Sequence, residues 1–599
     1  MPWRGNSGGP SHLIGGTLAR SEWSPGILAD LAFANLETRL KCFILDCDSE
    51  PLALFTEESR AQSRSGDWYG EHLGKWLVAA SHAAIRTKDP RLEEHISKVV
   101  QTVAAMQEPD GYLGTYASDS IARMTNLGSK DVRTWDVWVH SWTVLGLLDA
   151  SKVPGVKGGI ETADRIGRLL LDVFPDRHSS PLDLGNHAGL SSAVVLEPLV
   201  RLWEETNDAR YLDMAVRTLN DAEARGLSFL STCPDNDDVA QIGTGKIYQI
   251  LWILVGMVRL SQATQDKALL RSVELLWNDV RTHHLTPQGG PWGGIATHKE
   301  VFNPRGFFSP YGMVETCSTA TWMQLCLELF QVTHQEKYIA EYETSLLNAL
   351  LGSVDETCQD WSYFTSPNGR RLSTYYWACC RSSGSMAVES SSDAAIFETD
   401  HEIFVNLYLP TRSTMSRGTL TIKGDLGVDG NCELEFGLAG FHDVLFRVPN
   451  WASNFRIVVG DEAHVPSVNA GFFKLGRDWR LGDVVHVSCE CPIRVVPKSH
   501  TVDHHGQEVV RMDYATVMRG PLSYATGLID GYKQEETVRI PRLTPESPFR
   551  TVDRLGGHYG VPIEFCQPGR KPIVLLPYFE AAGRSEGKWR ASWLQVAWQ

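Results

Sequence analysis

The chain repeats a helix–turn–helix signature through its first two-thirds. In each copy an apolar helix end leads to a threonine, a short polar turn follows, and a new amphipathic helix begins. A large apolar residue stands five positions after each of these threonines. The threonines are Thr87, Thr206, Thr264 and Thr333, and the apolar residues are Leu92, Tyr211, Leu269 and Tyr338.

The spacing of the signature constrains the fold. The last three copies recur at about 60 residues, and the gap before them leaves room for a degenerate copy near Leu148. A repeat of this length is typical of helical hairpins packed side by side. Helices that are apolar around much of their circumference fit a double-layered ring. We therefore predict roughly six hairpins in an (α/α)6 barrel over residues 1–398, the expected catalytic domain.

The pattern changes at Glu402, after which short alternating runs are punctuated by Gly, Asp, Asn and Pro. Such runs are typical of β-strands with tight turns. We expect a β-sandwich domain over 399–500 and a second β-rich C-terminal domain over 501–599. A chain of 599 residues is long enough for several domains, so the predicted fold class is multi-domain α + β.

Composition limits the partners and the compartment. The formal net charge of −16 argues against nucleic acid, because phosphate binding needs a basic face. No apolar run reaches the length of a membrane span, so no membrane partner is expected. The first residues, MPWRGNSGGPSHLIGG, lack the apolar core of a signal peptide, and the 12 cysteines show no disulfide pattern. We expect a cytoplasmic protein whose partner is a small sugar or glycoside, with a homodimer left open.

Two short clusters carry the strongest chemical signal. Glu315-Thr316-Cys317 precedes a helix, and Cys379-Cys380 follows the aromatic run STYYWA, which reads as a strand. Three thiols and one carboxylate suffice for a closed tetrahedral zinc site. Zinc would hold the cysteines as thiolates, which are strong nucleophiles. The alternative is that these cysteines simply fill the core, as free cysteines often do.

Five further residues are weaker candidates. Glu300 lies in the loop after GGPWGGIA and suits a general acid, although by sequence alone it is no better than other loop carboxylates, most of which are solvated surface groups. His140 could line the interior of the ring or be a buried core histidine. Lys246 opens a helix and could bind a sugar hydroxyl or carboxylate, or be solvated. Trp68 and Glu71 are the remaining candidates for the substrate pocket.

Seven stretches together resemble the family-127 glycoside hydrolases, which are typified by β-L-arabinofuranosidases. They cover most of the chain up to about Ala525, and the ETC and CC pair is specific to that family. The stretches are GEHLGKWLVAA at Gly70, QEPDGYLGTY at Gln107, LEPLVRLWEETNDARYL at Leu196, ETCSTATWMQLCLELF at Glu315, ACC at Ala378, IFVNLYLP at Ile403 and MRGPLSY at Met518.

The resemblance implies an (α/α)6 catalytic barrel followed by β-sandwich domains. It implies that Glu315, Cys317, Cys379 and Cys380 hold Zn²⁺. It also implies that Cys379 is the nucleophile and Glu300 the acid/base of a retaining hydrolase that forms a thioglycosyl-enzyme.

The chain departs from the family pattern around the sugar. The family carries a further cysteine two positions before the CC pair, where this chain has Trp377. Its histidine-rich motifs are replaced by GTGKIYQ, which contains Lys246, and by WDVWVHSW. The metal and nucleophile therefore carry over, whereas the sugar pocket does not. The substrate is left open between a β-L-arabinofuranoside and a related furanoside, including one with a carboxylate for Lys246 to pair with.

Three functional hypotheses follow. The first is hydrolysis of a non-reducing-end furanoside. The second is a zinc-containing barrel recruited to a lyase- or cyclase-type conversion of a small metabolite. The third is a sugar-binding protein without catalysis, against which the intact Cys379 and Glu300 argue. Release of free sugar carrying solvent oxygen separates hydrolysis from the others.

Overall fold

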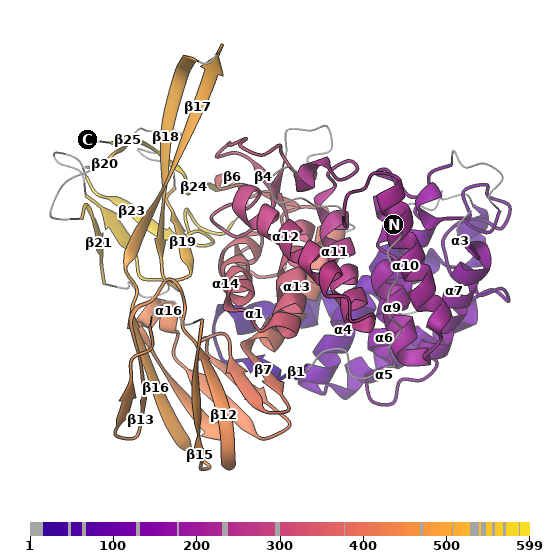
Figure 1. Cartoon of the computed structure of the whole chain (residues 1–599), viewed down its shortest axis with the longest axis horizontal. Helices are drawn as coiled ribbons and strands as arrows, with labels where there is room; N and C mark the ends of the chain where they lie inside the picture. Colours follow the sequence, from indigo (N-terminus) through magenta and orange to yellow (C-terminus); the bar gives the residue numbers. More distant parts are fainter. Residues whose placement is uncertain are drawn as a thin grey trace.

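The computed structural model has a helical part beside a β-rich part, coloured indigo to pink and orange to yellow in Figure 1. The β-rich part follows the helical part along the chain and stacks beside it as two groups of sheets. The structure describes residues 16–45, 49–62, 68–126, 132–176, 179–230, 238–293, 300–375, 378–467, 471–505, 507–527, 538–540, 547–553, 558–566, 569, 571–585 and 587–598.

Six inner helices form a closed ring. Each contacts the next along the chain, and the last contacts the first. These helices are strongly buried, and every residue of the second inner helix is buried. The glycines of the first two allow close approach, because a Cβ at Gly74 would lie 2.0 Å from the carbonyl oxygen of Trp142. The inner helices are α4 (Glu71–Thr87), α6 (Asp136–Ala150), α9 (Leu196–Thr206), α11 (Ile247–Ala263), α13 (Thr316–Thr333) and α15 (Cys379–Ser391).

A second layer of amphipathic helices surrounds this ring. Five outer helices follow the first five inner helices along the chain. The sixth, α1 (Ile27–Ala34), comes from the N-terminal region and contacts α15. This arrangement confirms the predicted (α/α)6 barrel. The other outer helices are α5 (Pro90–Met106), α7 (Gly159–Val173), α10 (Ala209–Ala224), α12 (Lys267–His283) and α14 (Glu336–Thr344).

Short helical segments complete the barrel and its loops. They are η1 (Asn35–Leu40), α2 (Glu50–Ala53), α3 (Glu57–Ala61), η2 (Trp68–Gly70), η3 (Pro181–Asp183), α8 (Leu190–Ala193), η4 (Val239–Gln241), η5 (Ser345–Leu350) and η6 (Ser392–Ala395).

The repeated threonine marks the turn between an inner helix and its outer partner. In all four copies its hydroxyl donates to the carbonyl four residues earlier, at 2.6–2.8 Å. The next residue has a left-handed backbone, which ends the inner helix. In three copies an aspartate follows and caps the outer helix with its side chain. The apolar residue five positions after each threonine is buried, at 0–2% exposure.

Two sheets form the sandwich, and the N-terminal strands join both of them. The prediction placed residues 1–398 in the barrel, yet β1 pairs with β7 and β2 pairs with β9. These pairings join residues almost 400 positions apart, which local patterns cannot reveal. One sheet has the order β1 (Gly16–Leu18), β7 (Ile396–Thr399), β8 (Glu402–Val405), β12 (Gly440–Arg447) and β15 (Phe472–Trp479). The other has the order β14 (Glu462–His464), β13 (Ser453–Val459), β16 (Asp483–Glu490), β11 (Asn431–Gly437), β10 (Thr419–Lys423), β9 (Thr411–Thr414) and β2 (Arg20–Trp23).

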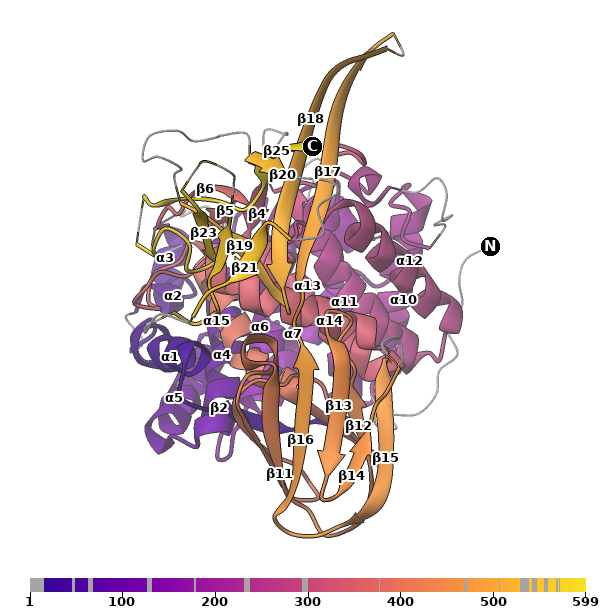
Figure 2. The same cartoon turned by 90° about the vertical axis from the view of Figure 1, so that its left-hand side faces the viewer.

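The C-terminal strands form a third sheet, next to the short helix α16 (Leu426–Asp429) that packs on the sandwich. Its β17 and β18 make a long hairpin that projects from the body (Figure 2). In order, this sheet contains β20 (Val538–Ile540), β25 (Leu594–Trp598), β18 (Gln507–Arg519), β19 (Leu522–Ala525), β23 (Ile573–Pro577), β22 (Ile563–Phe565) and β21 (Phe549–Thr551), with β17 (Ile493–His504) beside β18.

The same C-terminal region is attached to the barrel. Strand β24 (Trp589–Ala591) pairs with β6 (Asn368–Arg370). Just before β6 in the chain, β5 (Phe364–Thr365) pairs with β4 (Met313–Glu315), which in turn pairs with β3 (Trp292–Gly293). The C-terminal strands therefore support the segment that borders the cysteine cluster. No helix in the described ranges combines the length and the apolar character that a membrane span needs.

Candidate metal centre and active site

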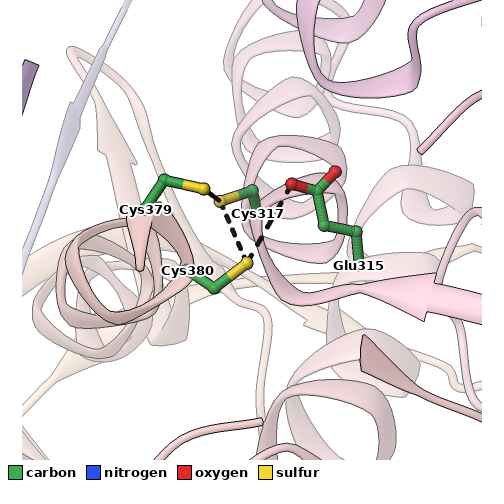
Figure 3. Close-up of side chains that lie close together, drawn as sticks. All are labelled: Glu315, Cys317, Cys379 and Cys380. Carbon is green, nitrogen blue, oxygen red and sulfur yellow. Dashed lines mark hydrogen bonds between the residues drawn. The ribbon is translucent and has the colours of Figure 1, made fainter. Parts of the chain in front are cut away.

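The predicted metal ligands meet at the N-terminal ends of two neighbouring inner helices. Glu315 ends β4 and directly precedes α13, whose first turn contains Cys317. Cys379 and Cys380 are the first two residues of α15, which contacts α13. Figure 3 shows the three sulfur atoms and the carboxylate turned toward one another.

Their spacing suits a tetrahedral ion. The Cys317 sulfur lies 3.5 Å from that of Cys379 and 3.3 Å from that of Cys380. The Cys380 sulfur is 4.0 Å from Oε1 of Glu315, and all four ligand atoms lie within 4.8 Å of one another. Zinc–sulfur bonds of about 2.3 Å place tetrahedral sulfur ligands about 3.8 Å apart. None of the three cysteines is in a disulfide, so the donor set fits zinc.

The three thiols differ in the direction in which their surroundings shift their pKa values. Hydrogen bonds from the Cys317 and Cys380 thiols lower the pKa of Cys379 well below its usual range, and the ammonium of Lys75 adds to this effect. Burial raises the pKa values of Cys317 and Cys380 well above theirs. The helix N-terminus also favours a thiolate at Cys379. Of the three cysteines, Cys379 therefore has the surroundings that most favour a thiolate, and a divalent cation would favour thiolates at all of them.

Glu300 lies beside this cluster. Its Oε1 accepts a 2.5 Å hydrogen bond from the hydroxyl of Tyr363, and that hydroxyl lies 3.4 Å from the Cys379 sulfur. The other oxygen, Oε2, pairs with the ammonium of Lys246. One tyrosine hydroxyl therefore separates the predicted acid/base from the predicted nucleophile. Sequence reasoning did not find Tyr363; its only signal was its place in the aromatic stretch WSYF.

A buried ion pair lies on the neighbouring helix α4. The Glu71 carboxyl accepts hydrogen bonds from Lys75, at 2.9 Å, and from the indole of Trp138, at 2.6 Å. Burial raises the pKa of Glu71 to about 7. Lys75 also donates to Ser383, one turn after the cysteines on α15, at 3.1 Å. Both Glu71 oxygens are thus bound to protein groups, and Lys75 went unnoticed in the sequence.

The two remaining candidates differ in their surroundings. Trp68 is half-buried in front of α4 and stacks on Tyr69, with ring centroids 4.2 Å apart. His140 is fully buried: its Nδ1 bonds the Asp136 carbonyl at 2.8 Å, and its Nε2 accepts from the amide of Leu113 at 3.1 Å. Both ring nitrogens of His140 thus bond backbone groups and are not available to a substrate.

The run STYYWA before the cysteines was expected to be a strand. Residues 373–375 are instead irregular, and Trp377 lies outside the described residues. The amide of Thr374 bonds the carbonyl of Trp361, and that of Ala378 bonds the carbonyl of Tyr375. The first bond joins this run to a distant loop residue and the second is a turn bond, so neither belongs to a strand ladder.

A second acidic group combines Asp238, Asp279 and His284. The guanidinium of Arg305 lies 2.6 Å from Asp279, and the backbone amide of Val239 donates to the same carboxylate at 2.8 Å. Arg305 already supplies a positive charge to this network. The group therefore suits a structural role better than a metal site.

Comparisons with known proteins show which family the chain is similar to. A family model described as the GH127 catalytic domain of β-L-arabinofuranosidase matches residues 35–393, and the GH127 middle-domain model matches residues 402–491. A non-reducing end β-L-arabinofuranosidase of Bifidobacterium longum subsp. longum is 20% identical over 511 residues, which are 76% of this chain and 75% of the relative.

Solved structures share the whole fold. A GH127 β-arabinofuranosidase superimposes with a TM-score of 0.76 at 17% identity, over 98% of this chain and 99% of its own. A GH127 β-L-arabinofuranosidase from Geobacillus stearothermophilus T6 gives a TM-score of 0.75 at 16% identity, over 96% and 100% of the two chains. At these identities the likeness supports the fold alone.

Proposed function

The chain belongs to the β-L-arabinofuranosidase family GH127 and is a glycoside hydrolase; from this premise we propose that it cleaves a non-reducing-end furanoside with retention, using Cys379 as the nucleophile. The observation that carries the proposal is the convergence of three thiols and two glutamates at one end of the barrel. Zn²⁺ held by Glu315, Cys317, Cys379 and Cys380 would keep the cysteines deprotonated and the site rigid.

In the first step the Cys379 sulfur attacks the anomeric carbon and a C–S bond forms. The bond from that carbon to the leaving oxygen breaks, and Glu300 as a carboxylic acid gives its proton to the leaving oxygen. In the second step Glu300 as a carboxylate takes a proton from water. The water oxygen attacks the anomeric carbon, the C–S bond breaks and the thiolate returns. Two displacements give net retention.

Tyr363 and Lys246 suit the orientation of Glu300 during these steps. Tyr363 donates to one carboxyl oxygen, and burial raises the pKa of its hydroxyl well above the usual range, so it remains a donor. Lys246 pairs with the other oxygen and favours the carboxylate, which is the form needed for the second step. The first step needs the protonated form. Bound substrate must therefore compete with Glu300 for Lys246.

This competition bears on the substrate. A neutral β-L-arabinofuranoside would offer Lys246 only hydroxyls. A furanoside with a carboxylate would offer it a charged partner, and would release Glu300 more completely. Paired aryl furanosides with and without a carboxylate test this point. We expect Lys246→Met to lower kcat/KM for the acidic member at least about tenfold more than for the neutral one. Equal losses for both would assign Lys246 to Glu300 alone.

The decisive experiment on the reaction is time-resolved NMR of an active aryl furanoside. The retained anomer should appear first, and the released sugar should carry one oxygen from labelled water. Initial release of the inverted anomer would remove Cys379 from the nucleophile role. An unsaturated or cyclised product without solvent oxygen would instead support the lyase- or cyclase-type alternative.

A further inference from the structure

The ring of inner helices encloses a cavity behind the cysteine cluster. It has a volume of about 170 Å³, and all six inner helices contribute to its lining. Its inner end is formed by Trp142, Tyr248 and Ser383, of which Ser383 lies one turn beyond the cysteines on α15. From there it extends past Asp149, Arg259 and Glu328, which lie in the C-terminal halves of α6, α11 and α13, away from the proposed active site.

The outer end of this cavity reaches solvent. Lys152 belongs to its lining and has a side chain that is 55% exposed. Lys152 and Leu18 also line a groove of about 810 Å³ that runs along β1, β7 and β9. A small molecule could thus enter from this groove without passing through the cysteine cluster.

A chain of ion pairs crosses the cavity wall. Arg201 lies 2.5 Å from Asp149, and Arg259 lies 2.6 Å from Glu328. Glu197 stands between the two guanidiniums, 3.8 Å from Arg201 and 3.5 Å from Arg259. Lys152 adds a third cation, 2.9 Å from Asp149, and the lining also contains Asp393, 3.4 Å from His82. Each acidic group of the wall thus has a basic neighbour, which favours a neutral ligand over a charged one.

The same wall keeps unused hydrogen-bonding capacity. Among the described residues, Oε2 of Glu197 and Oε2 of Glu328 have no hydrogen-bond donor, and Nε of Arg259 has no acceptor. The indole nitrogen of Trp142 is also without a hydrogen-bond acceptor. Leaving such a buried group without a hydrogen-bond partner is unfavourable. Hydroxyl groups both donate and accept, so they match this mixture of atoms.

We propose that this rear chamber, defined by Trp142, Glu197, Tyr248, Arg259 and Glu328, binds a small neutral polyhydroxylated molecule of the size of a pentose or a pentitol. The chamber is smaller than the pockets of about 300–1,000 Å³ that hold drug-sized ligands. Its aromatic rings suit the apolar faces of such a molecule, while the unpaired polar atoms suit its hydroxyls.

A ligand here would touch the underside of the proposed active site. The ammonium of Lys75, which bonds Glu71, lies 4.7 Å from the ring of Trp142 and 4.8 Å from that of Tyr248. The cavity and the cysteine cluster are thus separated by one layer of side chains. The rear site nevertheless does not depend on the proposed hydrolysis, because it uses different residues and a different entrance.

Xylitol is the probe for the test. Its binding to the intact protein is followed by ligand-observed NMR, and its position by a crystal structure of the soaked protein. Ala387 lines the chamber from α15, so Ala387→Phe should fill the space and weaken binding at least about tenfold. The matched control is Ala268→Phe, which adds the same bulk at an exposed position of α12. It should leave binding unchanged, as should Glu300→Gln in the active site.

Ordered xylitol in the chamber together with the loss in Ala387→Phe would support the proposal. Three results would overturn it. The first is a chamber that holds only water in the soaked protein. The second is density without measurable binding in solution, which means an adventitious additive only. The third is solution binding that Glu300→Gln abolishes and Ala387→Phe leaves intact, which would place xylitol in the active site. Should Ala387→Phe fail to fold, Ala387→Leu and the wild-type crystal structure decide the question.

Discussion

The two ends of the helical ring have opposite organisations. At the N-terminal end of the inner helices, three thiols and the Glu315 carboxylate converge on one point, and all of them are potential ligands of the same ion. Toward the C-terminal end, carboxylates and guanidiniums alternate between neighbouring helices, and each charge has an opposite partner. The first end gathers groups that would carry like charges once deprotonated, and a bound cation would hold them together. The second spreads opposite charges that bind the helices to one another.

This difference predicts a separation of roles. Variants at the cysteine end should lower activity while leaving folding almost unchanged, provided that the metal stays bound. Variants at the rear should lower stability while leaving the chemistry almost unchanged.

The largest effect is expected for Cys379→Ser. The serine hydroxyl is a poorer nucleophile than a thiolate, so kcat should fall by about 10⁴ or more. Zinc content must be measured in parallel, because loss of metal would imitate loss of the nucleophile. Cys432→Ala, in the buried core of the sandwich, controls for the removal of a thiol. A metal-loaded Cys379→Ser protein within tenfold of wild-type activity would show that another group attacks the sugar.

At the rear, Arg201→Met should have the largest effect on stability. Its removal leaves the buried Asp149 without the guanidinium that lies 2.5 Å away, and breaking a buried pair costs about 3–5 kcal/mol. Chemical denaturation should report this loss, while kcat of the folded protein stays within about twofold. Arg210→Met, at an exposed pair on α10, is the matched control. A large fall in kcat with unchanged stability would mean that the two ends are not separate.

Glu300→Gln should give a smaller and substrate-dependent effect. The amide cannot transfer a proton, so alkyl glycosides should lose about 10²-fold in kcat/KM. Nitrophenyl glycosides need little protonation and should lose less. Glu161→Gln, on the exposed face of α7, serves as the control. Equal losses with both leaving groups would remove Glu300 from the role of acid.

The sequence predicts the helical hairpins of the barrel well, but it does not predict how the N-terminal region completes the barrel. The threonine signature is local: it combines a C-terminal hydrogen bond, a left-handed residue and a cap within a few positions. It therefore reveals the hairpins directly. The pairing of β1 with β7 and the contact of α1 with α15 bring the N-terminal region to the distant end of the barrel. Nothing in the local pattern indicates either contact.

The same contrast applies to the site. The metal ligands occur in two short clusters with a distinctive composition, so they were visible in the sequence. Tyr363 and Lys75 act through single contacts made by tertiary packing, with Glu300 and Glu71 respectively. A lone tyrosine or lysine has no such signal. His140 was visible as a residue type, but only its hydrogen bonds to the backbone identify its structural role.

The smallest predicted effect is a pH dependence of stability that comes from the rear. Burial raises the pKa of Glu197 to about 7, from 4.5 as the ordinary value. Between these two pH values the folded protein keeps a proton that the unfolded chain has lost, so stability falls as pH rises through the window. Glu197→Gln removes this one contribution. Relative to wild type, its free energy of unfolding should therefore increase between pH 5 and pH 7, on the order of 1 kcal/mol per pH unit. Urea denaturation at both pH values measures this difference, and Glu161→Gln should produce none.

Other buried carboxyl groups titrate in the same range, among them Glu71, which pairs with Lys75. Part of the pH dependence of stability must therefore remain in Glu197→Gln. If instead the variant and the wild type keep the same slope, Glu197 is ionised throughout the window, and its charge is fully offset by Arg201 and Arg259.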